Sequence, residues 1–340
     1  MNELPQIGIR VDGSMGPREC VSLAQAAEAS GLAGVWFAEN AFARGILPAA
    51  AACAIATKNI RINSGVFNPY NRHPTLMAME IGALDELSNG RASLGIGAGI
   101  LAASEKMGLN AAKPAPALRD ALIIIRELLE NKEVDYQGSV FSAKKVKLNY
   151  RVRNDIPIYL AGRGNITVKL AGEFADGLLI SNMCSIKFAS HLAELMRFSA
   201  RAAGRSPSKK VVQYMPCATH ADSREAFFAA KVAIGEMLPR FWQLGQKLDS
   251  AKEALLAGTA ISESDFSDCT LRLLAGEKAA DVLDDRFVAA FSLSGTPDQC
   301  LVRAQQYKAM GIDELALTFS GPRAAEEIAA IGAALRSATT

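Results

Sequence analysis

Short apolar runs alternate with longer segments of helical periodicity along the first third of the chain. The apolar runs have the length of strands and are rich in β-branched and aromatic residues, whereas the longer segments place apolar residues on one helical face. Proline at the start of such a segment and glycine just after it are typical helix boundaries. These signals predict strands at 6–11, 33–38, 60–67 and 91–97, with helices at 17–30, 47–57 and 74–87 between them.

The same alternation resumes in the second half of the chain. It predicts strands at 156–161, 176–181, 211–219 and 313–319, with helices at 165–174 and 186–203 and another at the C-terminus. Strands separated by helical segments pair in parallel, because a parallel neighbour is reached only through a crossover connection. An open doubly wound sheet and a closed barrel both fit this order, and eight strands favour the (β/α)8 TIM barrel.

Two stretches depart from the rhythm. Residues 132–150 alternate apolar and polar positions around Gln137-Gly138, which predicts a hairpin excursion outside the barrel. Residues 222–290 are helix-rich and longer than one crossover requires, so we expect a helical insertion before the last strand. Without an interdomain linker or a repeat, residues 1–340 are interpreted as a single domain.

Composition excludes several classes of function. Lys and Arg total 37 against 35 for Asp and Glu, so nothing favours binding to nucleic acid or to an anionic membrane. The six cysteines lie far apart without a C-x-x-C pair and the histidines are isolated, so we expect buried thiols and no metal site. No signal peptide or membrane-length apolar run is found, which predicts a cytoplasmic protein.

Candidate chemistry lies where the strands end, because the loops at that edge build the active site of such barrels. In NSGVFNPYNRHP (63–74), Gly65 between Ser64 and Val66 suggests a bulge or a close approach to a ligand. An ordinary loop, with Asn68 supplying turn chemistry, explains the same residues. Composition leaves both interpretations open.

Two glycine-rich turns follow later strands. In GIGAG (95–99), the backbone of Gly97, Ala98 and Gly99 can admit a flat ring or a phosphate, although a flexible loop is an equal alternative. AGRGN (161–165) combines free amides at a helix start with a guanidinium, which favours a phosphate cradle over a solvated turn. The cradle residues are Gly162, Arg163, Gly164 and Asn165.

A carboxylate and an amide, Glu39 and Asn40, close the second strand. They are candidates for binding the substrate or the polar edge of a ring. Helix capping by Asn40 competes with that role.

Five ordered motifs resemble one known family. LDELSNGRASLGIGAG (84–99) is similar to a characteristic segment of the luciferase-like monooxygenase superfamily. Within it, the methylenetetrahydromethanopterin reductases carry similar motifs in the same order as NSGVFNPYNRHP (63–74), IPIYLAGRGN (156–165), LAGEFADGLLIS (170–181) and FSLSGTPDQ (291–299). The resemblance spans nearly the whole chain.

The resemblance implies a (β/α)8 barrel that uses coenzyme F420 or FMN. It assigns Ser64, Gly65 and Val66 to a bulge behind the tricyclic ring, with the Gly65-Val66 bond as the candidate for a non-proline cis peptide. It places Gly97, Ala98 and Gly99 beside the ring and residues 162–165 near the phosphate. We take these residues as the cofactor-binding candidates, together with Ser64, Gly65, Val66 and Asn68.

The chain departs from the reductases at two positions near the expected chemistry. Arg10 stands where they have a glutamate, thought to be an acid, and Ile100 where they have an aspartate. A guanidinium cannot protonate an amine near neutral pH. We therefore expect Arg10 to face the pocket and to pair with an anionic substrate group or with Glu39, and we take Arg10, Glu39 and Asn40 as the catalytic candidates.

The sequence thus predicts an oxidoreductase that transfers hydride to or from a small organic substrate, with F420 as the first choice of cofactor and FMN as the second. An FMN-dependent monooxygenase that uses molecular oxygen is one alternative, and a catalytically silent ligand-binding homologue is another. The resemblance also implies a homo-oligomer.

Overall fold

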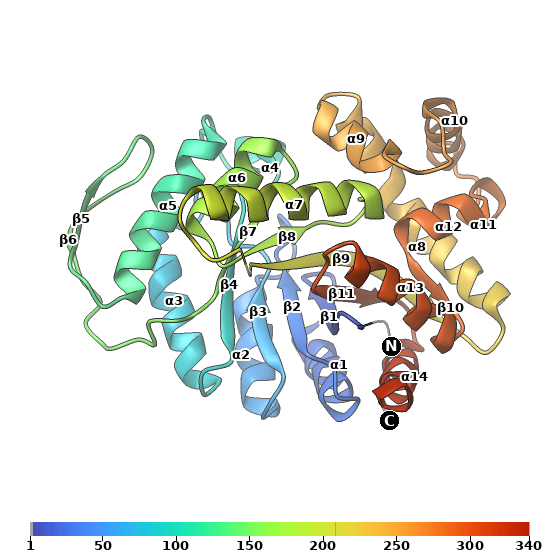
Figure 1. The fold of residues 1–340 in the computed structure, drawn as a ribbon, viewed down its shortest axis with the longest axis horizontal. Helices are drawn as coiled ribbons and strands as arrows, with labels where there is room; N and C mark the ends of the chain where they lie inside the picture. Colours follow the sequence, from blue (N-terminus) through green and yellow to red (C-terminus); the bar gives the residue numbers. More distant parts are fainter. Residues whose placement is uncertain (1–2, 208, 340) are drawn as a thin grey trace.

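The computed structural model describes residues 3–207 and 209–339, and eight parallel strands in it close into a barrel. Strand β8 pairs with β9, β9 with β11 and β11 with β1, so the sheet returns to its first strand. The predicted TIM barrel is confirmed and the open sheet was the wrong alternative (Figure 1). The barrel strands are β1 (Gln6–Asp12), β2 (Gly34–Ala38), β3 (Arg61–Ser64), β4 (Ala92–Ile96), β7 (Ile158–Ala161), β8 (Gly177–Ile180), β9 (Lys210–Thr219) and β11 (Glu314–Phe319).

Helices surround the barrel on its outer face (Figure 1). They are α1 (Pro17–Ala29), α2 (Ile46–Ala56), α3 (Pro74–Leu87), α4 (Leu101–Lys106), α5 (Pro114–Leu129), α6 (Asn165–Phe174), α7 (Ile186–Ala202), α13 (Pro297–Ala309) and α14 (Ala324–Thr339). The predicted helices agree with these bounds to within a residue or so. The sequence did not predict α4, α5 and α13, nor the short strand β10 (Leu293–Gly295), which pairs with β9.

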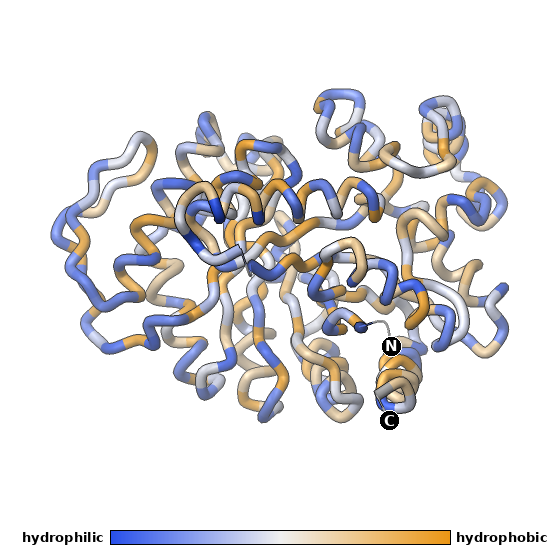
Figure 2. Tube along the Cα trace, viewed as in Figure 1, coloured by the Kyte–Doolittle hydropathy of each residue, from blue (hydrophilic) through white to orange (hydrophobic). Residues whose placement is uncertain are grey.

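Alternation along the strands divides the apolar residues between two sides of the sheet. On β1, Ile7, Ile9 and Val11 point outward and join the large core beneath the helices. Trp36 and Tyr214 belong to a smaller apolar cluster inside the barrel. Figure 2 shows the hydrophobic segments concentrated along the strands and on the helix faces that cover them. The barrel is therefore a packed core whose chemistry is confined to its ends.

The predicted excursion is an antiparallel hairpin of β5 (Val134–Gln137) and β6 (Ser142–Val146). It lies at the edge of the molecule, away from the barrel (Figure 1). The buried carboxylate of Asp120 on α5 holds it there by accepting hydrogen bonds from the N–H groups of Val140 and Phe141 and from the Tyr136 hydroxyl.

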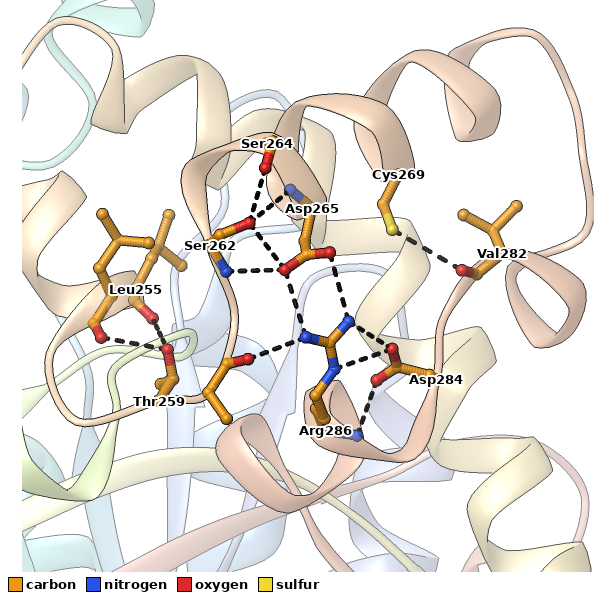
Figure 3. A network of polar contacts seen from close by, with 11 residues as sticks. Leu255, Thr259, Ser262, Ser264, Asp265, Cys269, Val282, Asp284 and Arg286 are labelled. Carbon is orange, nitrogen blue, oxygen red and sulfur yellow. Dashed lines mark hydrogen bonds and ion pairs between the residues drawn. The ribbon is translucent and has the colours of Figure 1, made fainter.

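The predicted insertion consists of five helices with an apolar cluster of their own, which includes the stacked rings of Trp242 and Phe266. Its polar side is held by Arg286, which binds both Asp265 and Asp284 (Figure 3). Its helices are α8 (Ser223–Gly245), α9 (Asp249–Leu256), α10 (Glu263–Leu274), α11 (Ala279–Val282) and α12 (Asp285–Phe291). The single-domain organisation stays a prediction.

All six cysteines are buried and free, as expected. Across the residues that the structure describes, no helix has both the length and the apolar character needed to span a bilayer. In the same residues, no group of three or more His, Cys, Asp and Glu side chains is arranged to hold a metal ion.

Candidate active site

The chain bulges directly after β3, as the sequence predicted. The Gly65-Val66 peptide bond is cis. Across the bulge, the Gly95 N–H donates to Ser64 Oγ at 3.0 Å, and the pairing with β4 resumes where the Phe67 N–H donates to the Gly95 carbonyl at 2.8 Å. The half-buried side chain of Val66 lies beside this irregular segment, at the C-terminal end of the barrel.

The glycines of the GIGAG turn make room for that bulge. A Cβ on Gly95 would lie 2.3 Å from the Ser64 carbonyl oxygen, and one on Gly97 would lie 2.8 Å from Val66 Cγ2. Gly99 has a φ of +66°, and a Cβ there would lie 2.8 Å from Asn68 Nδ2. The sequence had suggested flexibility or approach to a ligand, whereas the structure shows that these glycines first serve close packing between β3 and β4.

Two of the residues predicted for this region, Asn68 and Ala98, stabilise the local structure. Asn68 is buried and its Oδ1 accepts from the Tyr70 N–H at 3.0 Å, which shapes the loop after the bulge. Ala98 is half-buried between the glycines and packs against the main core. Ser64, Gly65, Val66, Gly97 and Ala98 nevertheless lie together at one side of the barrel mouth.

Tyr214 supports the bulge from β9 and was not identified from the sequence. Its hydroxyl donates to the Gly65 carbonyl at 3.1 Å, and its ring lies edge-on to Trp36 at 6.1 Å between centroids. Burial raises the pKa of Tyr214, so the phenol keeps the proton that it donates. Only the closure of the barrel brings β9 opposite β3, and no local signal marked this residue.

The predicted phosphate cradle gathers residues from three elements. Arg163 follows β7, with Gly162 before it and Gly164 as the N-cap of α6, which begins at Asn165. Its guanidinium donates to the Ser181 hydroxyl and to the Asn182 carbonyl, and it lies 5.2 Å from the ring centroid of Phe241 on the insertion. Nη1 of Arg163 and Oδ1 of Asn182 are buried and have no hydrogen-bond partner among the described residues.

Glu39 pairs with Arg72, which corrects one expectation. The Arg72 Nη1 lies 3.0 Å from Glu39 Oε2, and its Nε lies 2.8 Å from Glu80 Oε2. The guanidinium also covers the ring of Phe67 at 4.2 Å. A single arginine therefore links the mouth to α3, and Glu39 is not the partner of Arg10.

Asn40 is exposed, and the helix after it is capped elsewhere. Helix α2 has Gly45 at its N-cap, so the capping role considered for Asn40 is wrong. The Asn40 side chain instead lies close enough to Asp12 to help lower the pKa of that carboxylate.

Arg10 points into the barrel at its C-terminal end, where it pairs with Asp12. The Arg10 Nη2 lies 3.2 Å from Asp12 Oδ2, and Nη1 donates to Thr318 Oγ1 on β11 at 3.4 Å. The guanidinium lies 5.3 Å from the ring centroid of Tyr214. The sequence anticipated a charged partner for Arg10 but missed Asp12, although alternation along a strand places residues two apart on the same face.

A separate cavity of about 320 Å³ lies at the opposite, N-terminal end of the barrel. The arginines around it are already bound to protein acceptors, Arg61 to Glu314 and Arg153 to Asp85. Because these charged groups already have hydrogen-bond partners within the protein, we interpret this end of the barrel as structural and not as a binding site.

Taken together, the fold and the mouth define an eight-stranded barrel that can hold a flat ring against the bulge and an anionic group at Arg163. The model of the luciferase-like monooxygenase family matches residues 4–314, and the chain belongs to this family of oxidoreductases. The family predicted from the motifs is confirmed.

Two of the similar proteins align with most of the chain, and a third aligns with about half of it. It is 29% identical to 5,10-methylenetetrahydromethanopterin reductase of Methanolobus tindarius over 91% of this chain and 93% of that protein. The structure of the coenzyme F420-dependent tetrahydromethanopterin reductase of Methanopyrus kandleri superposes with a TM-score of 0.80 at 26% identity and covers 97% of this chain and 98% of that one. An F420-dependent glucose-6-phosphate dehydrogenase of Amycolatopsis mediterranei is 30% identical over 49% of this chain and 54% of that protein.

Proposed function

We propose that this protein is an F420-dependent oxidoreductase that transfers hydride between the deazaflavin and a small organic substrate at the C-terminal mouth of its barrel. The observation that carries the proposal is that the C-terminal end of the barrel holds both a bulge fixed by Tyr214 and Ser64 and the buried Nη1 of Arg163, which has no acceptor among the described residues. The similarity to reductases and dehydrogenases described as F420-dependent supports the same cofactor.

The residues present fit such a cofactor. Arg163 Nη1 is a buried donor without an acceptor, and a phosphate oxygen would complete it. The N–H groups at the start of α6 would add donors, since the first turn of a helix leaves its amides free. Val66 and the backbone of Gly97 and Gly99 would contact the ring, while the insertion, through Phe241, would shield the phosphate from water.

Bound F420 would supply a ring carbon that accepts or donates hydride. The protein would hold the ring in place with the bulge, which is fixed by the hydrogen bond from the Tyr214 hydroxyl to the Gly65 carbonyl and by the one that Ser64 Oγ accepts from the Gly95 N–H of β4. Glu39, locked by Arg72, and the pair of Arg10 and Asp12 would line the space left for the substrate. Positioning and exclusion of water are then the chief contributions of the chain.

Titration of the purified protein with F420 and separately with FMN, in the oxidised and reduced forms, tests the proposal. We expect a micromolar Kd for F420, and we expect Arg163→Gln to weaken it by about tenfold or more, the usual size of a charge-assisted contact. Arg224→Gln, which removes an exposed arginine paired with Asp222, is the control. Failure to bind F420, or binding of FMN alone with consumption of oxygen, would contradict the proposal.

A cytoplasmic location and assembly into a homo-oligomer stay predictions of the sequence. Sedimentation velocity of the purified protein would test the second of these.

A further inference from the structure

Two oppositely charged side chains lie together on the inner face of β1. Arg10 and Asp12 are two residues apart, so both point into the barrel. Their side chains are 12% and 15% exposed, and Arg10 Nη2 lies 3.2 Å from Asp12 Oδ2. The two charges compensate each other, so this part of the mouth has little net charge. It therefore favours neither an anionic nor a cationic reacting group of the substrate.

Arg10 is incompletely bonded in this position. Within the part of the chain that the structure describes, its Nε has no hydrogen-bond partner, and its contact with Thr318 Oγ1 is long at 3.4 Å. Guanidinium groups only donate, so the missing partner is an acceptor such as an oxygen atom. The guanidinium also contacts the ring of Tyr214, which hydrogen-bonds to Gly65, and this places the pair next to the segment proposed to support the cofactor ring.

Near neutral pH, Asp12 rests in the form that accepts a proton. Burial raises the pKa of Asp12, but hydrogen bonds from Ser14 and the charge of Arg10 outweigh burial and hold the pKa below its ordinary value. Asp12 is therefore ionised near neutral pH. The other carboxylate at the mouth, Glu39, is bound to Arg72. The ionised carboxylate of Asp12 is therefore not suited to protonate a substrate nitrogen.

We propose that the substrate is an alcohol or the carbonyl compound formed from it, with Arg10 and Asp12 as the catalytic pair that binds its oxygen. This inference rests on the proposed function. In the oxidation, Asp12 Oδ2 would accept the hydroxyl proton while Arg10 stabilised the negative charge that develops on the oxygen. The C–H bond would break with its electron pair, and the C–O bond would become C=O. Bound F420 would supply the two-electron acceptor for that hydride.

The experiment follows oxidised F420 with a panel of primary and secondary alcohols, and reduced F420 with the matching aldehydes and ketones. Methylenetetrahydrofolate is the probe for a carbon–nitrogen substrate. We expect turnover of alcohols or carbonyl compounds, and we expect Asp12→Asn to lower kcat by about 100-fold or more, as loss of a general base does. The Kd for F420 should stay within a few-fold, and kcat/KM should fall at acidic pH as Asp12 is protonated.

Asp222→Asn is the matched control, because Asp222 also accepts from the N–H two residues on and pairs with an arginine two residues away. A second readout needs no turnover: 19F NMR of trifluoroethanol should show saturable line broadening with the protein, which Arg10→Leu abolishes and Asp222→Asn does not. Loss of F420 binding would overturn the proposed function and this inference with it. If F420 binds normally, three results would overturn this inference alone. They are preferred turnover of methylenetetrahydrofolate, absence of turnover with every alcohol and carbonyl compound, and full activity of Asp12→Asn.

Discussion

The hydroxyl of Tyr214 on β9 donates to the carbonyl oxygen of Gly65 at 3.1 Å, across the interior of the barrel. This hydrogen bond joins the bulge after β3 to a strand that lies 149 residues further along the sequence. Since Tyr214 also lies under the guanidinium of Arg10, one side chain touches both the proposed cofactor wall and the proposed substrate pair.

Tyr214→Phe should destabilise the protein, because the Gly65 carbonyl would stay buried without its donor. We expect a loss of about 1–3 kcal/mol in the free energy of unfolding, the cost of an unsatisfied buried group. Denaturant titration measures it. Tyr150→Phe is the control, because that hydroxyl also donates to a backbone carbonyl, of Met79, but at the surface. Equal losses in the two variants would contradict the role given to burial.

Gly95→Ala should disrupt the packing of the bulge, because the new Cβ would lie 2.3 Å from the backbone oxygen of Ser64. A contact that close forces the strands apart, and we expect destabilisation of about 1–3 kcal/mol together with weaker binding of F420. Gly16→Ala is the control, since no described atom lies within 4 Å of a Cβ built there and the residue is outside the proposed cofactor site. Thermal unfolding and F420 titration of both variants check the expectation, and an unperturbed Gly95→Ala would refute it.

Arg72→Met should leave the carboxylates of Glu39 and Glu80 without their shared cation. The three side chains are only 17–24% exposed, so we expect a loss of about 2–4 kcal/mol. Adding Glu39→Gln should recover part of that loss, because one of the uncompensated charges is then removed. Urea denaturation of the single and double variants measures the coupling, and strictly additive losses would argue against the ion pair.

Asp176→Asn should destabilise the protein at neutral pH and remove part of its sensitivity to acid. Burial raises the pKa of Asp176, but Arg126, the Ile158 N–H and Lys209 outweigh burial and hold the pKa below the ordinary 3.8. The folded state therefore binds this proton less tightly than the unfolded state. The stabilisation is fully present above about pH 4 and is lost as pH falls through the lower folded-state pKa.

We expect Asp176→Asn to lower the free energy of unfolding at pH 7 by about 1–3 kcal/mol, with the difference from the unchanged protein shrinking below pH 4. Asp135→Asn, at an exposed position of the hairpin, serves as the control. Denaturant titrations between pH 3 and pH 7 supply the comparison. A difference that does not depend on pH would count against the ionised carboxylate.

The periodicity of the sequence determined the barrel and its two excursions, because helix and strand spacing depend on local side-chain pattern. It also located the ends of the strands, and with them the bulge at Gly65, the turn at Gly97 and the arginine at 163. Glycine and proline allowed these positions to be predicted, because glycine frees and proline restricts the backbone conformation locally.

Only the tertiary structure decided how these places work together. The partner of Arg10 is Asp12, that of Glu39 is Arg72, and the support of Gly65 comes from Tyr214. Even the glycines of the fourth strand serve the packing of the third, at Gly95 against Ser64. Closure of the barrel brings residues distant in the chain within hydrogen-bonding distance of each other. The spacing of residues along a sequence does not determine which distant side chain will become the partner of a given residue.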